Sequence, residues 1–186
     1  MALPVAKWRF DVDAYHRMAE SGILAPNDSV ELIDGEVLHM SPMGSRHAAC
    51  VDRLLHTLFQ PLAGRAIVRC QSPIRLNRHN EPEPDLTLLR PREDFYATAH
   101  PSAEDVLWVI EVSDSSLDFD RQVKLPLYAQ FGIPEVWILD LGSDQILIHG
   151  QPSGLAYAEQ RTHGGGETFT TRAFPDLQLS VDSLIP

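Results

Sequence analysis

Residues 106–141 contain two short apolar runs on either side of a mixed segment, and they read VLWVIEVSDSSLDFDRQVKLPLYAQFGIPEVWILDL. The runs at 106–112 and 135–141 are bounded by polar, Gly and Pro residues, which is typical of buried strands. A helix is expected between them, at 119–131. Pro126 lies inside that helix, and because an interior proline costs about 3 kcal/mol it predicts a kink or a shorter helix. Strand, helix and strand in this order indicate a domain that mixes α and β structure.

Signals on both sides of this stretch extend the pattern. Asp34-Gly35 adopts positive φ at little cost and lies between two apolar segments, so it predicts a two-residue hairpin. Apolar residues recur at helical spacing from His47 to Gln60, which predicts an amphipathic helix. The other expected elements are a helix at 10–20, extended segments at 66–76 and 86–89, and short strands at 145–149, 155–160 and 167–171. We therefore expect one mixed α/β (α+β) domain over residues 1–186, with an N-terminal helical extension over about 1–25.

The composition is that of an acidic globular protein. The chain has 186 residues, and its 15 Lys and Arg against 26 Asp and Glu give a formal net charge of −11. The length suits one domain with a proper core, and the 44% hydrophobic content excludes wholesale disorder. An acidic chain is a poor candidate for a non-specific polyanion binder, because phosphate contacts need clustered Lys and Arg.

The sequence predicts a cytoplasmic protein with no membrane partner. Cys50 and Cys70 form neither a C-x-x-C pair nor a disulfide framework, which favours a reducing compartment. The longest apolar runs are far shorter than the roughly 20 residues of a membrane helix. The first ten residues include Lys7 and Arg9 and lack the apolar region of a signal peptide.

Two carboxylates stand at the ends of predicted strands. Asp85 directly precedes the strand at 86–89, and Glu111 lies near the end of the strand at 106–112. If these strands are antiparallel neighbours, the start of one lies beside the end of the other, so both carboxylates meet at one edge of the sheet. Hard oxygen ligands of this kind suit Mg²⁺. The alternative is a pair of strand-end carboxylates that are solvated or bridged to basic side chains.

Three polar residues form a stripe on the helix that follows. Asp120, Lys124 and Tyr128 are spaced four residues apart, so they share one helix face. One interpretation is a surface Asp–Lys pair with a half-buried Tyr. The other is that Lys124 projects toward Glu111 and orients a water or neutralises charge that develops on a phosphate.

Two further candidates precede Asp85. His47 begins the predicted helix at 47–60, where it is placed to donate to a phosphate at the helix N-terminus. Glu31 lies one residue into an apolar run. Both also fit a simpler interpretation, in which His47 is exposed to water and Glu31 faces solvent from an alternating strand.

These residues occur in an order that resembles a known family. The shared segments are Glu31-Leu-Ile-Asp-Gly-Glu36, Ser41-Pro42 with Arg46-His47, Pro84-Asp85-Leu86, Val109-Ile-Glu-Val-Ser113, then Asp120, Lys124, Tyr128, Gly132-Ile-Pro-Glu-Val-Trp137 and Asp140. In this combination the sequence resembles the bacterial Uma-two family of restriction endonucleases, which have the PD-(D/E)XK nuclease fold. The resemblance covers roughly residues 30–140.

The resemblance implies a restriction-endonuclease-like core, a mixed sheet flanked by helices, with a Mg²⁺-dependent phosphodiesterase site. Asp85 matches the aspartate of the PD motif, and Glu111 matches the acidic residue of the (D/E)XK motif. The lysine position of that motif is Ser113 here, and Lys124 on the following helix occupies the place of the family's lysine. In this interpretation Asp85, Glu111 and the backbone carbonyl of Val112 bind Mg²⁺, for which Mn²⁺ is a substitute.

The same resemblance assigns roles to the remaining candidates. Lys124 positions or helps deprotonate the attacking water and stabilises the transition state. His47 or Glu31 completes the site by contacting phosphate or an outer water. The expected function is therefore a Mg²⁺-dependent endonuclease that hydrolyses nucleic acid, with DNA preferred, and that works as a homodimer.

Two alternatives remain open at the level of sequence. The first is a nuclease-like fold that serves as a binding or scaffold module without turnover, which the net charge of −11 and the serine at position 113 favour. The second is a small-molecule hydrolase that uses the same carboxylates.

Overall fold

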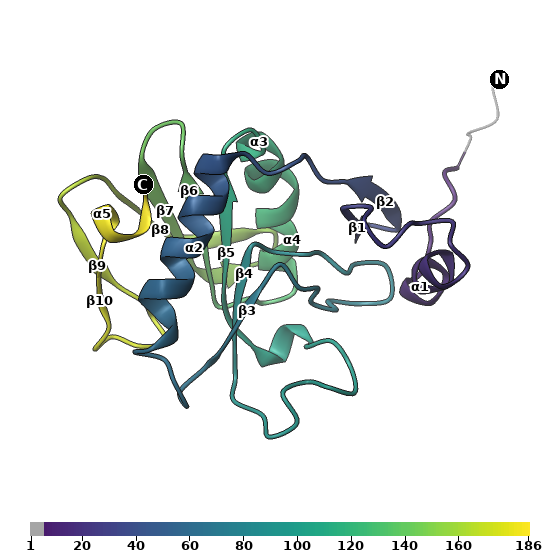
Figure 1. Ribbon diagram of the computed structural model, residues 1–186, viewed down its shortest axis with the longest axis horizontal. Helices are drawn as coiled ribbons and strands as arrows, with labels where there is room; N and C mark the ends of the chain where they lie inside the picture. Colours follow the sequence, from purple (N-terminus) through teal and green to yellow (C-terminus); the bar gives the residue numbers. More distant parts are fainter. Residues whose placement is uncertain (1–5) are drawn as a thin grey trace.

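The structure is a computed structural model that describes residues 6–186. A six-stranded sheet lies between helices, and two small two-stranded sheets flank it (Figure 1). The helical elements are α1 (Val12–Glu20), α2 (Ser45–Phe59), the 3₁₀ turn η1 (Ala103–Asp105), α3 (Leu117–Phe119), the π turn η2 (Asp120–Lys124), α4 (Leu125–Gln130) and α5 (Val181–Leu184). The strands are β1 (Val30–Ile33), β2 (Glu36–His39), β3 (Ile67–Cys70), β4 (Leu86–Leu89), β5 (Val106–Ser113), β6 (Glu135–Asp140), β7 (Gln145–Ser153), β8 (Ala156–His163), β9 (Thr168–Thr170) and β10 (Gln178–Ser180).

The central sheet is mixed, as the expected fold class requires. Its strand order is β3-β4-β5-β6-β7-β8. β5 and β6 are parallel, with Ile110 opposite Trp137, whereas the other neighbouring strands of this sheet are antiparallel. Parallel strands cannot be joined by a tight hairpin, so the chain crosses one face of the sheet as α3, η2 and α4 before it returns as β6. The predicted strand, helix and strand over 106–141 form this crossover unit.

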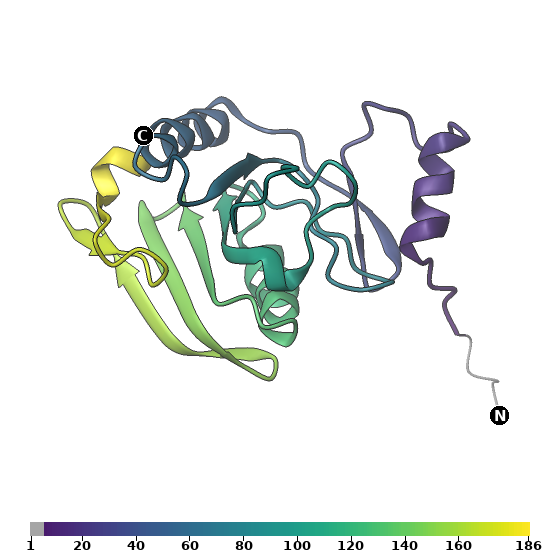
Figure 2. The same cartoon turned by 90° about the horizontal axis from the view of Figure 1, so that it is seen from below.

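Each face of the sheet has its own apolar core, because the central strands are buried on both faces. Trp108 and Trp137 belong to the core that also contains Leu54 and Leu58 of α2, and the two indole rings lie 5.5 Å apart. On the opposite face Tyr128 of α4 belongs to the second core. In Figure 2 the sheet lies between α2 and α4. The helices therefore cover opposite faces, and the polar ends of the central strands are left to form a site.

The crossover helix differs from the expected helix at 119–131. The helical segment begins at α3, and its middle is a π turn in which the Leu125 N–H donates to the Asp120 carbonyl. Pro126 follows immediately, near the start of α4. Proline has no N–H, so a regular α-helix would lack one hydrogen bond at this position, and the wider π turn lies where that bond is missing. Turns of this kind often occur at functional sites. The predicted disturbance at Pro126 takes this form, and it leaves Asp120 and Lys124 buried.

A long connection between β3 and β4 reaches from the sheet to the N-terminal hairpin. The strand expected over 66–76 ends at Cys70, because Pro73 cannot donate to a ladder and the chain leaves the sheet. Farther along, the Glu81 N–H donates to the Leu32 carbonyl at 2.8 Å, and the Leu32 N–H donates to the Glu81 carbonyl at 3.3 Å. These bonds fix the hairpin of β1 and β2 beside the start of β4.

The hairpin and α1 form a separate N-terminal layer beside the sheet (Figure 2). Asp34 and Gly35 both have positive φ, 51° and 73°, as a two-residue turn of the predicted type requires. The Phe10 N–H donates to the Gly35 carbonyl at 2.9 Å, and Tyr15 Oη donates to the Val30 carbonyl at 2.9 Å. The expected helix in this extension is confirmed as α1; the first five residues of the extension lie outside the described residues.

Within residues 6–186, no helix has the length and apolar character needed to cross a lipid bilayer.

We expect Gly35→Ala to destabilise the protein more than Gly64→Ala, by about 1–3 kcal/mol in the free energy of unfolding. Both glycines have similar positive φ, 73° and 75°, so alanine carries the same backbone strain at either position. At Gly35, however, an added Cβ would lie 2.7 Å from Arg9 Cβ, whereas at Gly64 nothing lies within 4 Å. Urea unfolding of both variants measures the difference. Equal losses would show that the segment before α1 does not pack tightly on the turn.

Candidate active site

The predicted meeting of Asp85 with the end of β5 is present in the structure. β4 and β5 are antiparallel neighbours, and Leu86 pairs with Ile110. Asp85 therefore lies beside the end of β5, and its Oδ2 accepts a hydrogen bond from the Val112 N–H at 2.8 Å. Asp85, Glu111 and Val112 all line one cavity of about 500 Å³. The strand geometry thus brings together the residues that the sequence placed at one sheet edge.

The cavity wall is strongly acidic. It extends from the hairpin of β1 and β2 across the end of β5 to the π turn, and Lys124 is the one Lys or Arg among its lining residues. The carboxylates in the lining are those of Glu31, Glu83, Asp85, Glu111, Asp114 and Asp120. Such a surface repels a phosphodiester unless a cation lies between them.

Glu111 is buried beside one cation and one hydroxyl. Its Oε1 accepts a 2.6 Å hydrogen bond from Tyr128 Oη and lies 3.2 Å from Lys124 Nζ. The pKa of Glu111 is raised to about 8: burial is the main cause, the Asp120 and Asp85 carboxylates add to it, and Lys124 and Tyr128 oppose it. The charged form of this carboxyl group is therefore disfavoured when no further cation is present.

Lys124 forms the centre of a buried ion-pair cluster. Its Nζ lies 3.2 Å from Glu31 Oε2 and 3.2 Å from Glu111 Oε1, and all three side chains are at most 6% exposed. Burial alone would lower the pKa of Lys124, but the carboxylates of Glu111, Glu31 and Asp120 outweigh it and raise the pKa above its ordinary value. The side chain is consequently an ammonium ion at neutral pH. The interpretation of Lys124 as half of a surface pair is wrong.

Glu31 is buried as well, contrary to the solvent-facing alternative. It lies on β1, is 2% exposed and accepts a 3.1 Å hydrogen bond from the Glu83 N–H through Oε2. The same oxygen contacts Lys124. Glu31 is therefore the group through which the N-terminal hairpin joins the cavity.

His47 lies against Asp85. It is in the first turn of α2, and its Nε2 is 3.2 Å from Asp85 Oδ2. The hydrogen bond to Asp85 raises the pKa of His47, and the burial of the ring opposes the rise. Nδ1 is buried and has no partner among the described residues. His47 thus contacts a carboxylate at the cavity wall, and the interpretation of an exposed histidine is wrong.

Asp120 and Glu83 are cavity residues that the sequence did not identify as candidates. Asp120 Oδ2 accepts hydrogen bonds from Ser113 Oγ at 2.7 Å and Ser116 Oγ at 2.6 Å. Ser113, at the usual lysine position of the nuclease motif, therefore supports an acidic side chain from the helix. The sequence could have identified Asp120 as a cavity residue, because its spacing places it on the same helix face as Lys124. For Glu83 the sequence offers no such indication beyond its place in the loop before Asp85.

Each of the two proposed metal-binding carboxylates has one oxygen with no hydrogen-bond or ion-pair partner among the described residues. Both hydrogen bonds that the described residues make to the Asp85 carboxylate go to Oδ2, which leaves Oδ1 for a ligand. The Tyr128 and Lys124 contacts of Glu111 likewise involve Oε1, which leaves Oε2. Two carboxylate oxygens from adjacent strands and the neighbouring backbone of Val112 form a donor set of the type that Mg²⁺ prefers.

Five arginines interact with oxygen atoms away from the cavity. Within the described residues, the guanidinium groups interact with carbonyl or carboxylate oxygens away from the cavity: Arg46 with Leu141 and Asp144, Arg53 with Asp182 and Ile185, Arg69 with Phe95, Arg75 with Asp13, and Arg78 with Asp11. None of these five lines the cavity. The positive charge that would attract a polyanion is therefore not concentrated at this site.

The molecule is a mixed α/β protein in which β4 begins and β5 ends at an acidic cavity. A crystal structure of "a putative nuclease belonging to DUF820" from Anabaena variabilis ATCC 29413 has a similar fold, with a TM-score of 0.69 and 16% sequence identity. The similarity covers 95% of this chain and 97% of that one. The chain belongs to the Uma2 family, "Putative restriction endonuclease", whose model matches residues 12–182. No curated protein matches the chain significantly.

We expect the free energy of unfolding to fall as pH rises from about 6.5 to 8.5, and Glu111→Gln to flatten this dependence. The folded carboxyl group keeps its proton up to about 8, while its unperturbed pKa is 4.5, so the folded state binds more protons over this range. The predicted contribution reaches about 1.4 kcal/mol per pH unit. Urea unfolding at several pH values in metal-free buffer measures both slopes. Parallel slopes for the two proteins would contradict a raised pKa at Glu111.

Proposed function

We propose that this protein is a divalent-metal-dependent endonuclease that hydrolyses phosphodiester bonds in nucleic acid, with DNA as the preferred substrate. The observation that carries the proposal is the cavity at the ends of β4 and β5, where Asp85 and Glu111 lie with the buried Lys124. Membership of a family described by restriction-endonuclease activity supports the same reaction class.

The charge balance of the cavity supports a metal ion. Its carboxylates outnumber the single Lys124 ammonium, and burial raises the pKa of both Glu111 and Asp120. These raised values indicate that the carboxylates lack sufficient compensating charge. Asp85, Glu111 and the Val112 carbonyl would hold Mg²⁺, or Mn²⁺ in its place. When bound, the ion would lower the pKa of a coordinated water and stabilise negative charge on the phosphate.

Lys124 acts as a cation in this proposal and not as a base. Its raised pKa keeps Nζ protonated at neutral pH, so it cannot accept a proton from water. Its position beside Glu111 suits an electrostatic role, in which the ammonium orients the attacking water and stabilises charge that develops on the phosphate. Glu31 holds the ammonium in place from the opposite side through its 3.2 Å contact.

His47 has a positioning and phosphate-contacting role. Its Nε2 contacts Asp85 Oδ2 and thereby orients that carboxylate. Its Nδ1 is buried without a described partner and suits a hydrogen bond to an outer water, whereas contact with a phosphate oxygen would require the ring to turn. The hydrogen bond to Asp85 raises the pKa of His47 and burial opposes the rise, so the interaction with Asp85 outweighs the burial of the ring.

Substrate binding should depend strongly on the metal. The cavity contains Lys124 as its one Lys or Arg, and Arg46, Arg53 and Arg69 are engaged elsewhere within the described residues. A polyanion therefore gains little from direct contacts with basic side chains. Weak binding that disappears in a chelator follows from this arrangement.

One observation favours a second function, a nuclease-fold binding module without turnover. Lys124 Nζ contacts both Glu31 and Glu111, so the ammonium is already compensated by protein carboxylates. An ammonium in this state reaches a phosphate only if one of the two contacts loosens. The two functions differ in turnover and in their need for a metal ion, which only the nuclease requires.

We expect the purified chain to cleave plasmid DNA in Mg²⁺ or Mn²⁺. Asp85→Asn and Glu111→Gln should each lower the rate at least about 100-fold, since each removes a proposed metal ligand. Lys124→Met should cause a loss of similar size while metal binding persists. Asp118→Asn is the matched control, because this exposed Asp does not line the cavity.

Three outcomes separate the alternatives. Cleavage that survives both Asp85→Asn and Glu111→Gln would show that this cavity is not the active site. Calorimetric binding of Mn²⁺ to the wild type without cleavage of DNA or RNA would support the binding module. Absence of metal binding at millimolar concentration would exclude the metal-dependent nuclease and leave the binding module.

The proposal includes a homodimer, because two copies of one active site can address both strands of a duplex. Sedimentation of the purified chain at several concentrations should give a mass of about twice 20.8 kDa. A monomer that nicks one strand per binding event would contradict this part of the proposal and leave the active site unaffected.

A further inference from the structure

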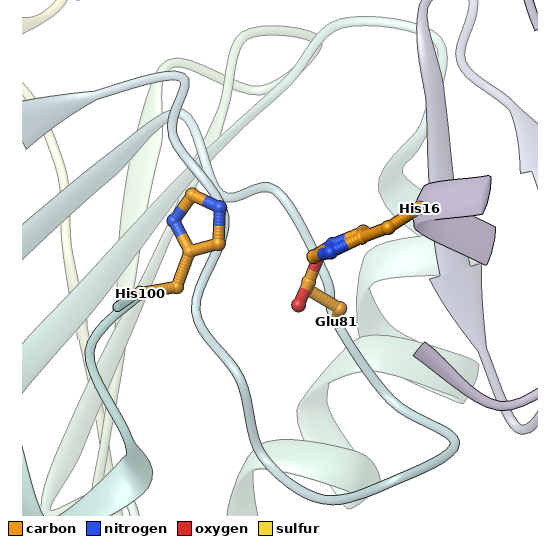
Figure 3. A group of neighbouring side chains, drawn as sticks. All are labelled: His16, Glu81 and His100. Atoms are coloured by element: carbon orange, nitrogen blue, oxygen red, sulfur yellow. The ribbon is translucent and has the colours of Figure 1, made fainter. Parts of the chain in front are cut away.

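A second group of potential metal ligands lies outside the cavity. His16 comes from α1, Glu81 from the connection between β3 and β4, and His100 from the loop that precedes η1. Figure 3 shows the two imidazole rings on either side of the Glu81 carboxylate. One donor atom from each residue can be chosen so that all three lie within 4.8 Å of one another. Three segments distant in sequence therefore converge at one point.

The separations among these three side chains are close to those of ligands around one metal ion. His16 Nε2 lies 2.6 Å from Glu81 Oε1, and the rings of His16 and His100 are 6.2 Å apart between centroids. A tetrahedral Zn²⁺ with bonds of about 2.0–2.2 Å holds its ligand atoms about 3.3 Å apart. The His16–Glu81 contact must widen slightly and His100 must approach. Both histidines are at least partly exposed and are placed to adjust.

Glu81 provides independent evidence for a ligand. Its side chain is 1% exposed, and its Oε2 is buried with no hydrogen-bond partner among the described residues. A buried carboxylate oxygen without a partner is costly and rare, so such an atom needs an explanation. A cation bound between Glu81 and the two imidazoles would give this oxygen a partner.

We propose that His16, Glu81 and His100 bind a divalent transition-metal ion, with Zn²⁺ the best-suited probe. Imidazole nitrogen is a good ligand for Zn²⁺ and its neighbours but a poor one for Mg²⁺. The exposed side of the group leaves room for water as a fourth ligand. The cavity at Asp85 and Glu111 offers oxygen donors, so the two sites select different metals.

The consequence of metal binding is mechanical. The ion would tie α1 to two loops of the main sheet. Glu81 also pairs through its backbone with Leu32, the residue next to Glu31, so the ion would brace the hairpin that supplies the partner of Lys124. Because the three ligands come together only in the folded chain, the ion would stabilise the folded state.

Calorimetric titration of the metal-free full chain with Zn²⁺ tests the site. We expect one equivalent to depend on these residues, and His100→Ala and Glu81→Gln each to weaken it at least about 100-fold, since even residues outside a ligand shell change affinity about 10–100-fold. His56→Ala, an exposed histidine on α2, is the matched control and should bind Zn²⁺ as the wild type does. His100→Ala alters an exposed loop residue, so it keeps the test interpretable if Glu81→Gln misfolds.

A second measurement uses stability. Zn²⁺ should raise the Tm of the wild type and of His56→Ala by several degrees and leave His100→Ala unchanged. Asp85→Asn should retain the full rise, which separates this site from the proposed nuclease cavity. A Zn²⁺ equivalent that survives both His100→Ala and Glu81→Gln, or a wild type that binds no Zn²⁺ at millimolar concentration, would overturn the proposal.

Discussion

The buried contact of Lys124 with Glu31 and Glu111 is the interaction on which the arrangement of this molecule depends. It joins three elements: the N-terminal hairpin, the strand β5 and the crossover helix. Removal of a charged group from water costs several kcal/mol, so each member of such a cluster needs the others in place. Lys124 is the last residue of the π turn, and its side chain is buried among the carboxylates and not in solvent. The fold is thereby tied to the geometry of the cavity.

One ammonium does not balance the carboxylates around it, and this imbalance links structure to chemistry. The pKa of Glu111 rises and that of Asp120 rises with it, since burial penalises their charged forms. A bound divalent cation would remove that penalty, which is why an acidic cavity and a phosphodiester substrate are compatible in the proposed function. The net charge of −11 therefore does not decide against nucleic acid. The absence of arginines from the cavity lining instead predicts that binding depends on the metal.

Much of the fold and part of the candidate site could be predicted from local patterns. Apolar runs identify β5 and β6, and the turn at Asp34-Gly35 follows from the ease of positive φ at those residues. The order of Asp85 and Glu111 at strand ends predicts their proximity once the strands pair. The helical spacing placed Asp120 on one face with Lys124. It did not reveal that the hydroxyl groups of Ser113 and Ser116 donate hydrogen bonds to the Asp120 carboxylate. Glu83 lines the cavity from a loop, and hydrophobic periodicity does not predict where a loop residue lies.

By itself, the sequence determined the strands and helices, the hairpin turn and the carboxylates at the ends of β4 and β5, because these follow from spacing within a few residues. Only the tertiary structure decided how those groups are charged and which partners they meet. Ion pairing raises the pKa of Lys124, burial raises the pKa of Glu111, and neither effect exists in an extended chain. The group of His16, Glu81 and His100 likewise arises only when α1 and two loops pack together. Desolvation and long-range contact are properties of the folded chain, so no local pattern could supply them.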